Sequence, residues 1–143
     1  MKLAIALALG FGAVALASGL DAIKAEPNLE KRSKLALDYA NSEIDAARQA
    51  YTSGDMKGST AALVEVRDAV DLCVQALDDT HKDARKSPKA FKRAEMDIRE
   101  MIRRLRSLED DFSLDDRGEV LKTEQRLQEV HDDLITRIMT KRK

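Results

Sequence analysis

Two side chains that could bind a metal or carry redox chemistry lie within the apolar pattern of this chain. Cys73 is the only cysteine, and His131 is one of two histidines. Both fall among apolar residues that recur with helical spacing, so each is expected to point towards a helical core. A thiol beside an imidazole forms either a nucleophile with its base or a soft metal site. A metal- or redox-binding bundle that uses Cys73 and His131 is therefore one candidate function.

The same two residues also have a purely structural interpretation. Free cysteine is among the most often buried residue types, which makes Cys73 a natural small core residue. Outside the cytoplasm a lone thiol can instead form an intermolecular disulfide. If the helices are antiparallel, counting residues from the turn between the third and fourth predicted helices places His131 level with Ile98 and Met101. The same count from the other end of the bundle places His131 near Cys73. No carboxylate is evident to orient the imidazole, so we expect no metal and no cofactor.

Basic residues dominate the segment between positions 81 and 106. It holds ten Lys or Arg and four Asp or Glu, a local net charge of +6. If Phe91, Ile98 and Leu105 face a core, helical spacing turns outward a row of side chains that contains no acidic residue. The residues expected to bind an anionic partner through this outer face are Lys89, Lys92, Arg99, Arg103 and Arg106.

A basic helix face either stays solvated, pairs with acidic neighbours or binds an anionic partner. The partners considered are an envelope protein, an anionic glycopolymer and lipid headgroups. We do not expect nucleic acid, because the sequence pI is near 6.2 and no aromatic residue interleaves with the basic row to stack on bases. Catalytic triads, glycine-rich phosphate loops and the helical di-iron pattern are missing, so the sequence predicts that the protein is not an enzyme.

The N-terminus has the pattern of a bacterial secretory signal peptide. Lys2 precedes the apolar run 3–17, LAIALALGFGAVALA, which ends in the small-x-small cleavage signal Ala15-Leu16-Ala17. The run of about 15 residues is shorter than the roughly 20 that a spanning helix needs. We expect cleavage after Ala17, or at the latest after Ala25, and a periplasmic or secreted mature protein without a transmembrane span. An uncleaved N-terminal anchor is the alternative.

The remaining chain is predicted to form a flexible segment at 18–27 and one helical domain at 28–140. Four blocks of 3-4-3-4 apolar spacing begin near residues 28, 56, 88 and 117. The turn residues between them indicate where each helix stops and starts. They are Gly54 in a left-handed conformation, Asp55 as a helix cap, Ser87 as a cap before Pro88, and the run Ser113–Asp116.

Seams that repeat every seven residues pack helices at shallow angles, and short connections make successive helices antiparallel. The sequence therefore predicts an all-α fold, an antiparallel up-down-up-down four-helix bundle. In the alternative, a three-helix core leaves the first helix loosely docked or swapped into a dimer, because two of its five seam positions are alanine. A third functional interpretation is a purely structural protein that self-associates into a homo-oligomer through an exposed seam.

The first predicted turn resembles that of a tetratricopeptide-type hairpin. The residues that carry the resemblance are Ala47, Ala50, Tyr51, Gly54, Asp55 and Leu63. The likeness covers a single turn, and no second copy follows at a period of about 34 residues. We interpret it as shared turn chemistry that implies no function.

Overall fold

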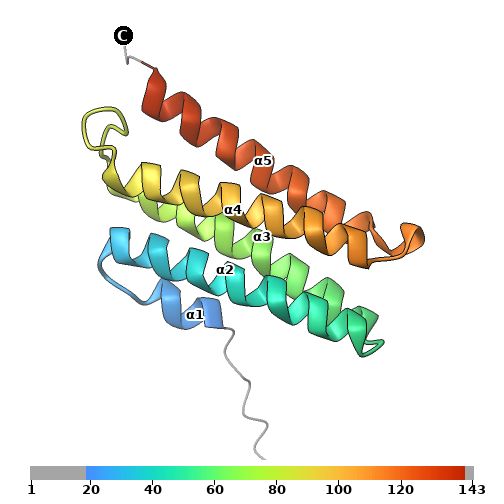
Figure 1. Cartoon of the computed structure of the whole chain (residues 1–143). Coiled ribbons are helices and arrows are strands. Elements are labelled where there is room, and N and C mark those ends of the chain that lie inside the picture. The colour runs from blue at the N-terminus through green and yellow to red at the C-terminus, as the bar shows by residue number, and fades with distance from the viewer. Residues whose placement is uncertain (1–18, 141–143) are drawn as a thin grey trace, which may run out of the picture.

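Four long helices packed against one another form the body of the protein (Figure 1). The computed structural model describes residues 19–140, and the predicted signal peptide lies outside the described residues. The elements are α1 (Gly19–Lys24), α2 (Leu29–Thr52), α3 (Met56–Asp79), α4 (Lys89–Asp111), the 3-10 turn η1 (Leu114–Asp116) and α5 (Gly118–Met139). Helices α2 to α5 alternate in direction, and no strand occurs within residues 19–140. The predicted all-α four-helix bundle is confirmed.

Local hydrogen bonds explain where α2 and α3 begin and end. The Asn28 side chain accepts a hydrogen bond from the backbone N of Lys31 at 3.0 Å and caps α2. Gly54 follows α2 with φ +81°, a conformation that glycine adopts without steric cost. The Asp55 side chain accepts from the backbone N of Gly58 at 2.8 Å and caps α3. This turn is formed as its residue types predict.

The predicted cap at the start of α4 is not formed. Pro88 already has helical dihedral angles, φ −82° and ψ −10°, and no side-chain hydrogen bond caps this end of the helix. The backbone N of Ser87 donates instead to the carbonyl of Asp83 at 2.8 Å, so the chain enters α4 from a preceding turn.

The acidic run before α5 does not cap that helix either. α5 begins at Gly118 without a side-chain cap. The Asp116 carboxylate faces the bundle and accepts hydrogen bonds from the Ser113 hydroxyl at 2.8 Å and the Tyr51 hydroxyl at 3.0 Å. The Tyr51 ring also stacks on Phe112, with ring centroids 3.8 Å apart. These contacts fasten the α4–α5 connection to the end of α2.

The helices are arranged as two hairpins packed side by side. α2 packs on α3 and α4 packs on α5, while α2 also lies along α4 and α3 along α5. α3 and α4 make only a marginal contact, although they follow each other in the chain. The connection 80–88 therefore crosses the end of the bundle diagonally, and the two hairpins meet through parallel helix pairs (Figure 1).

Small side chains make the α2–α3 contact the most extensive among the described helices. The Ser59 hydroxyl on α3 donates to the backbone carbonyl of Ala47 on α2 at 3.1 Å, which requires the two helix backbones to approach closely. The buried alanines of the two helices are Ala36, Ala40, Ala47, Ala62, Ala69 and Ala76. The alternative of a loosely docked first helix is therefore wrong: alanine at its seam shortens the helix–helix distance and does not weaken the packing.

Ion pairs flank the core where the hairpins meet. Between the parallel helices α3 and α5 they are Arg67–Glu119, Asp71–Arg126 and Asp78–Arg137. Arg104 on α4 likewise pairs with Asp45 on α2. Because these side chains are partly exposed, each pair contributes little to stability, but together they favour one pairing of helix faces over the others.

Part of the segment expected to be flexible is folded. Helix α1 occupies Gly19–Lys24, and Leu20 is buried in the core at 4% exposure. Gly19 lies so close to α2 that an added Cβ would come within 2.5 Å of the Tyr39 ring. Leu20 and the partly buried Ile23 pack this short helix against the core. None of the helices within the described range is long and apolar enough to cross a membrane.

Candidate functional site

The five residues predicted to bind an anionic partner all lie exposed on α4. α4 presents Phe91, Ile98 and Leu105 to the core, each at most 2% exposed. Ala94, Glu95, Met101 and Ile102 are buried as well. The five basic residues are exposed, so the basic row lies on an outer face as predicted. It divides into two parts that differ in their electrostatic surroundings.

The C-terminal part of the row is compensated by carboxylates. Its pairs are Arg99 Nε to Glu95 Oε1 at 3.5 Å, Arg103 to Glu100 at 2.6 Å, and Arg106 Nε to Glu124 Oε1 at 2.9 Å. More than half of each arginine side chain is exposed, so each pair is weak and can exchange with a competing anion. These arginines nevertheless contribute little net positive charge.

The N-terminal part of the row has no such compensation. Lys89 and Lys92 are exposed and form no ion pair with any residue in the described range. Arg85 and Lys86, in the connection that precedes α4, are also exposed, and they form no ion pair with any described residue. We call Arg85, Lys86, Lys89 and Lys92 the basic end. From position 84 to 94 the chain contains no acidic residue.

Positive charge at this position opposes the dipole of α4. The first turn of α4 carries no acidic residue, and its last turn carries no basic one. Cations near a helix N-terminus cost roughly 0.3–1 kcal/mol each where they are not compensated. The basic end therefore does not stabilise the fold.

A depression of about 350 Å³ lies beside the arginines, between α4 and α5. Its lining residues are Arg99, Ile102, Arg103, Arg106, Gln128 and His131. The carboxylates Glu95 and Glu124 already hold Arg99 and Arg106 at its rim. An anion that entered this depression would have to displace them.

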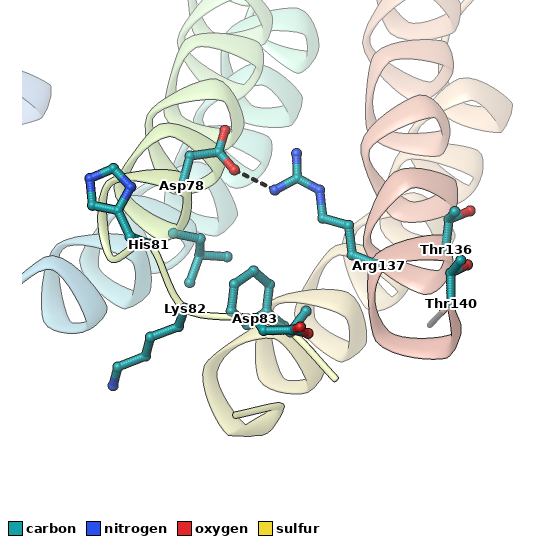
Figure 2. Close-up of a pocket in the computed structure, with 10 residues that line it drawn as sticks. Asp78, His81, Lys82, Asp83, Thr136, Arg137 and Thr140 are labelled. Atoms are coloured by element: carbon teal, nitrogen blue, oxygen red, sulfur yellow. Dashed lines mark hydrogen bonds and ion pairs between the residues drawn. The ribbon is translucent and has the colours of Figure 1, made fainter. Parts of the chain in front are cut away.

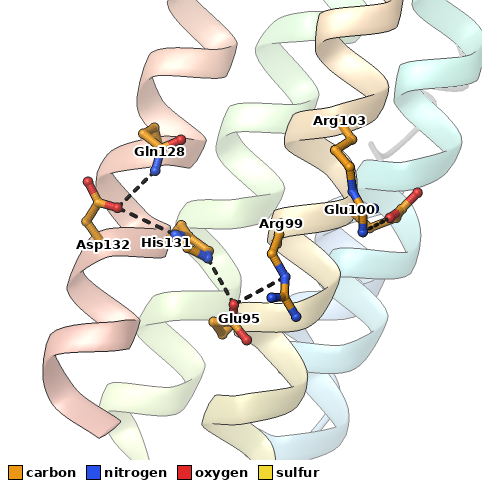
Figure 3. A network of polar contacts seen from close by, with 7 residues as sticks. All are labelled: Glu95, Arg99, Glu100, Arg103, Gln128, His131 and Asp132. Atoms are coloured by element: carbon orange, nitrogen blue, oxygen red, sulfur yellow. Dashed lines mark hydrogen bonds and ion pairs between the residues drawn. The ribbon is translucent and has the colours of Figure 1, made fainter. Parts of the chain in front are cut away.

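His131 reaches across to α4 and does not point into the core (Figure 3). Its Nε2 lies 2.9 Å from Oε1 of Glu95, a residue only 8% exposed, and its Nδ1 lies 3.5 Å from Oδ1 of Asp132. The orienting carboxylate that the sequence did not reveal is therefore Glu95. Counting back along the chain placed His131 level with Ile98, about one turn away from its observed partner.

Cys73 is a core residue of α3 with no exposed surface. Burial and, to a smaller extent, the negative charge of Asp97 together raise the pKa of its thiol to about 12. No hydrogen bond joins Cys73 to His131. Within residues 19–140, no group of three or more His, Cys, Asp or Glu side chains is placed to hold a metal ion. The structure does not bring together the two residues of the metal or redox alternative.

A cavity of about 610 Å³ opens at the end of the bundle, between α3, the connection 80–88 and α5 (Figure 2). Arg137 extends from α5 to Asp78 on α3 across this cavity and also pairs with Asp133 at 2.8 Å. Lys82 pairs with Glu30 at 2.7 Å. Both cations that line the cavity are thus already bound to carboxylates.

Comparison with known proteins found no match for this chain. No protein-family model, no curated protein and no solved structure matches it. Functional inference therefore depends on the chain's own residues and their geometry.

Proposed function

We propose that this is an exported, non-enzymatic helical-bundle protein that binds an anionic partner through the basic outer face of α4. The observation that carries the proposal is the basic end, where exposed cations have no carboxylate partner within the described residues. The binding residues are Lys89, Lys92, Arg99, Arg103 and Arg106. The partner is an acidic envelope protein, an anionic glycopolymer or a lipid headgroup surface.

Electrostatics supports a binding role for this face. Elsewhere on α4, arginines pair with carboxylates of the same or a neighbouring helix, as Arg104 does with Asp45. Uncompensated cations gathered at one end of a nearly neutral protein create a local positive potential, which draws anionic partners into encounter. Such binding weakens as salt screens the charges.

Export is supported by the residue pattern 3–17. The position of α1 bears on where a signal peptide would be cleaved. Cleavage after Ala17 leaves α1 whole, whereas cleavage after Ala25 would remove α1 together with its buried Leu20 and expose the core that this leucine covers. We therefore propose Ser18 as the first residue of the mature protein. Sequencing the N-terminus of protein isolated from the periplasm or the culture medium tests this directly.

Charge reversal tests the binding face. In the triple variant K89E/K92E/R103E, binding to immobilised dextran sulfate and to anionic vesicles should fall at least tenfold, because favourable charge contacts become repulsive. The matched control K24E/K57E/K122E changes three exposed lysines outside the row. Circular dichroism and melting temperature establish that both variants fold. Equal binding by the two variants, or binding that does not respond to salt, would refute the proposal.

A further inference from the structure

We propose that the basic end and three exposed apolar side chains beside it form a docking surface for an anionic phospholipid bilayer. The inference rests on the proposed function and assigns its partner. Met96, Ile135 and Met139 are 57%, 39% and 74% exposed, although all three are large apolar residues. None of them belongs to the buried core.

The register of the α4–α5 hairpin places these side chains near the basic end. The Glu95–His131 hydrogen bond fixes the two antiparallel helices at one level. One helical turn further towards the basic end, α4 presents Lys92 and α5 presents Ile135. Two turns further, α4 has reached Lys89 and α5 has reached Met139. Cations and apolar side chains therefore follow the same pair of helices to the same end of the bundle.

The acidic residues near this surface already have partners. On α5, Asp132 accepts a hydrogen bond from Gln128 at 2.9 Å, and Asp133 pairs with Arg137 at 2.8 Å. On α4, burial raises the pKa of the Asp97 carboxyl, and the charge of nearby Arg93 offsets part of this rise. Gln128 is neutral and leaves the negative charge of Asp132 in place, but the four cations of the basic end, Arg85, Lys86, Lys89 and Lys92, outnumber it.

Two properties of the surface together favour a bilayer over a soluble polyanion. A glycopolymer or an acidic polypeptide would bind the lysines but would gain little from exposed methionine and isoleucine. At a membrane surface, basic side chains attract anionic headgroups while apolar side chains enter the region where headgroups meet acyl chains. An anionic bilayer uses both properties of the surface.

A tryptophan reporter tests insertion, since the chain contains no tryptophan. The variants M96W and M139W place a single indole within the docking surface. The control V64W places one on α3, at a residue 37% exposed and outside the docking surface. With phosphatidylglycerol vesicles, emission of M96W and M139W should shift to the blue and be quenched by brominated acyl chains. V64W should show neither change, and phosphatidylcholine vesicles should affect none of the variants.

Removal of charge tests the electrostatic part. The pair K89A/K92A should lower partitioning onto phosphatidylglycerol vesicles by about 25-fold, since each lysine near an anionic surface contributes about fivefold. The matched pair K24A/K57A should leave partitioning unchanged. Melting temperatures of all variants confirm that the bundle remains folded.

The outcomes separate the bilayer assignment from the proposed function. Salt-sensitive binding to dextran sulfate without any blue shift on vesicles would overturn the bilayer assignment and leave the proposed function standing. If K89A/K92A still bound both dextran sulfate and anionic vesicles as the parent does, the bilayer assignment and the proposed function would both be overturned. A blue shift of M96W without lipid, with a doubled mass in light scattering, would assign the surface to a second copy of the chain and overturn the proposal.

Discussion

Glu95 on α4 and His131 on α5 are joined by a hydrogen bond of 2.9 Å between Oε1 and Nε2. Both side chains are largely buried, with 10% and 17% of their surface exposed. A buried carboxylate that loses its partner keeps the cost of its desolvation, so this contact holds the middle of the α4–α5 hairpin in register.

We predict that the variants H131A and E95A each lower the free energy of unfolding by about 1–3 kcal/mol. The double variant should lose less than the sum, with a coupling energy of about 1 kcal/mol in urea unfolding. The exposed pair Gln128–Asp132 provides the comparison and should show coupling near zero. Strictly additive losses at Glu95 and His131 would show that the contact contributes nothing.

Tyr51 holds the α4–α5 connection against α2. Its hydroxyl donates to Asp116 and accepts from the backbone N of Ser113 at 2.9 Å. Replacement by phenylalanine keeps the stacked ring and should cost about 1–2 kcal/mol. Hydrogen exchange should accelerate within residues 112–117 more than in the helices. In the control Y39F, whose hydroxyl contacts Glu65 at 3.3 Å, exchange in that segment should stay unchanged.

Ala47 is a buried residue of the α2–α3 contact, and its carbonyl accepts a hydrogen bond from the Ser59 hydroxyl at 3.1 Å. A leucine at this position must push the helices apart or adopt a strained rotamer, at a cost of about 1–3 kcal/mol or more. The control A61L adds the same side chain at an exposed position of α3 and should be close to neutral. A fully stable A47L variant would mean that the α2–α3 contact is looser than the Ser59–Ala47 hydrogen bond indicates.

Asp97 should make stability depend on pH. Burial raises the pKa of its carboxyl, and the positive charge of Arg93 offsets only part of that rise. A pKa higher in the folded than in the unfolded chain means that ionised Asp97 disfavours folding at neutral pH, and this penalty disappears below a pH of about 4. The variant D97N should therefore be more stable than the parent at pH 7 and equal to it at pH 3.

Urea unfolding at the two pH values measures this difference. The control D45N removes the partner of Arg104 and should lower stability slightly at pH 7. If D97N were less stable than the parent at pH 7, the pairing of Asp97 with nearby cations would outweigh its burial.

Cys73 should be unreactive in the folded protein. Burial raises the pKa of its thiol to about 12, so almost no thiolate exists at pH 8, and the side chain has no exposed surface. Modification of the thiol by a disulfide reagent should be slow in native buffer and complete within seconds in denaturant. At intermediate denaturant concentrations, the unfolding of the protein should limit the modification rate. Prompt stoichiometric labelling of the native protein would contradict this.

Heptad spacing was sufficient to predict the four helices and the turn at Gly54 and Asp55. That success has a local cause, because the apolar repeat, the left-handed glycine and the capping carboxylate each act within a few residues. The same local patterns failed at Ser87 and Asp116. At Asp116 the carboxylate hydrogen-bonds to Tyr51, a residue distant in sequence, and not to the nearby helix N-terminus.

In the candidate site, too, some features follow from local sequence and others depend on residues distant in the chain. The sequence alone determined that Lys89, Lys92, Arg99, Arg103 and Arg106 share one face of a helix, because helical geometry fixes which side chains point together. Only the tertiary structure decided which of these charges are neutralised, because Glu124 reaches Arg106 from another helix. The diagonal placement of α3 and α4 likewise depends on how the two hairpins pack, since helix spacing specifies which face is buried but not which neighbour covers it.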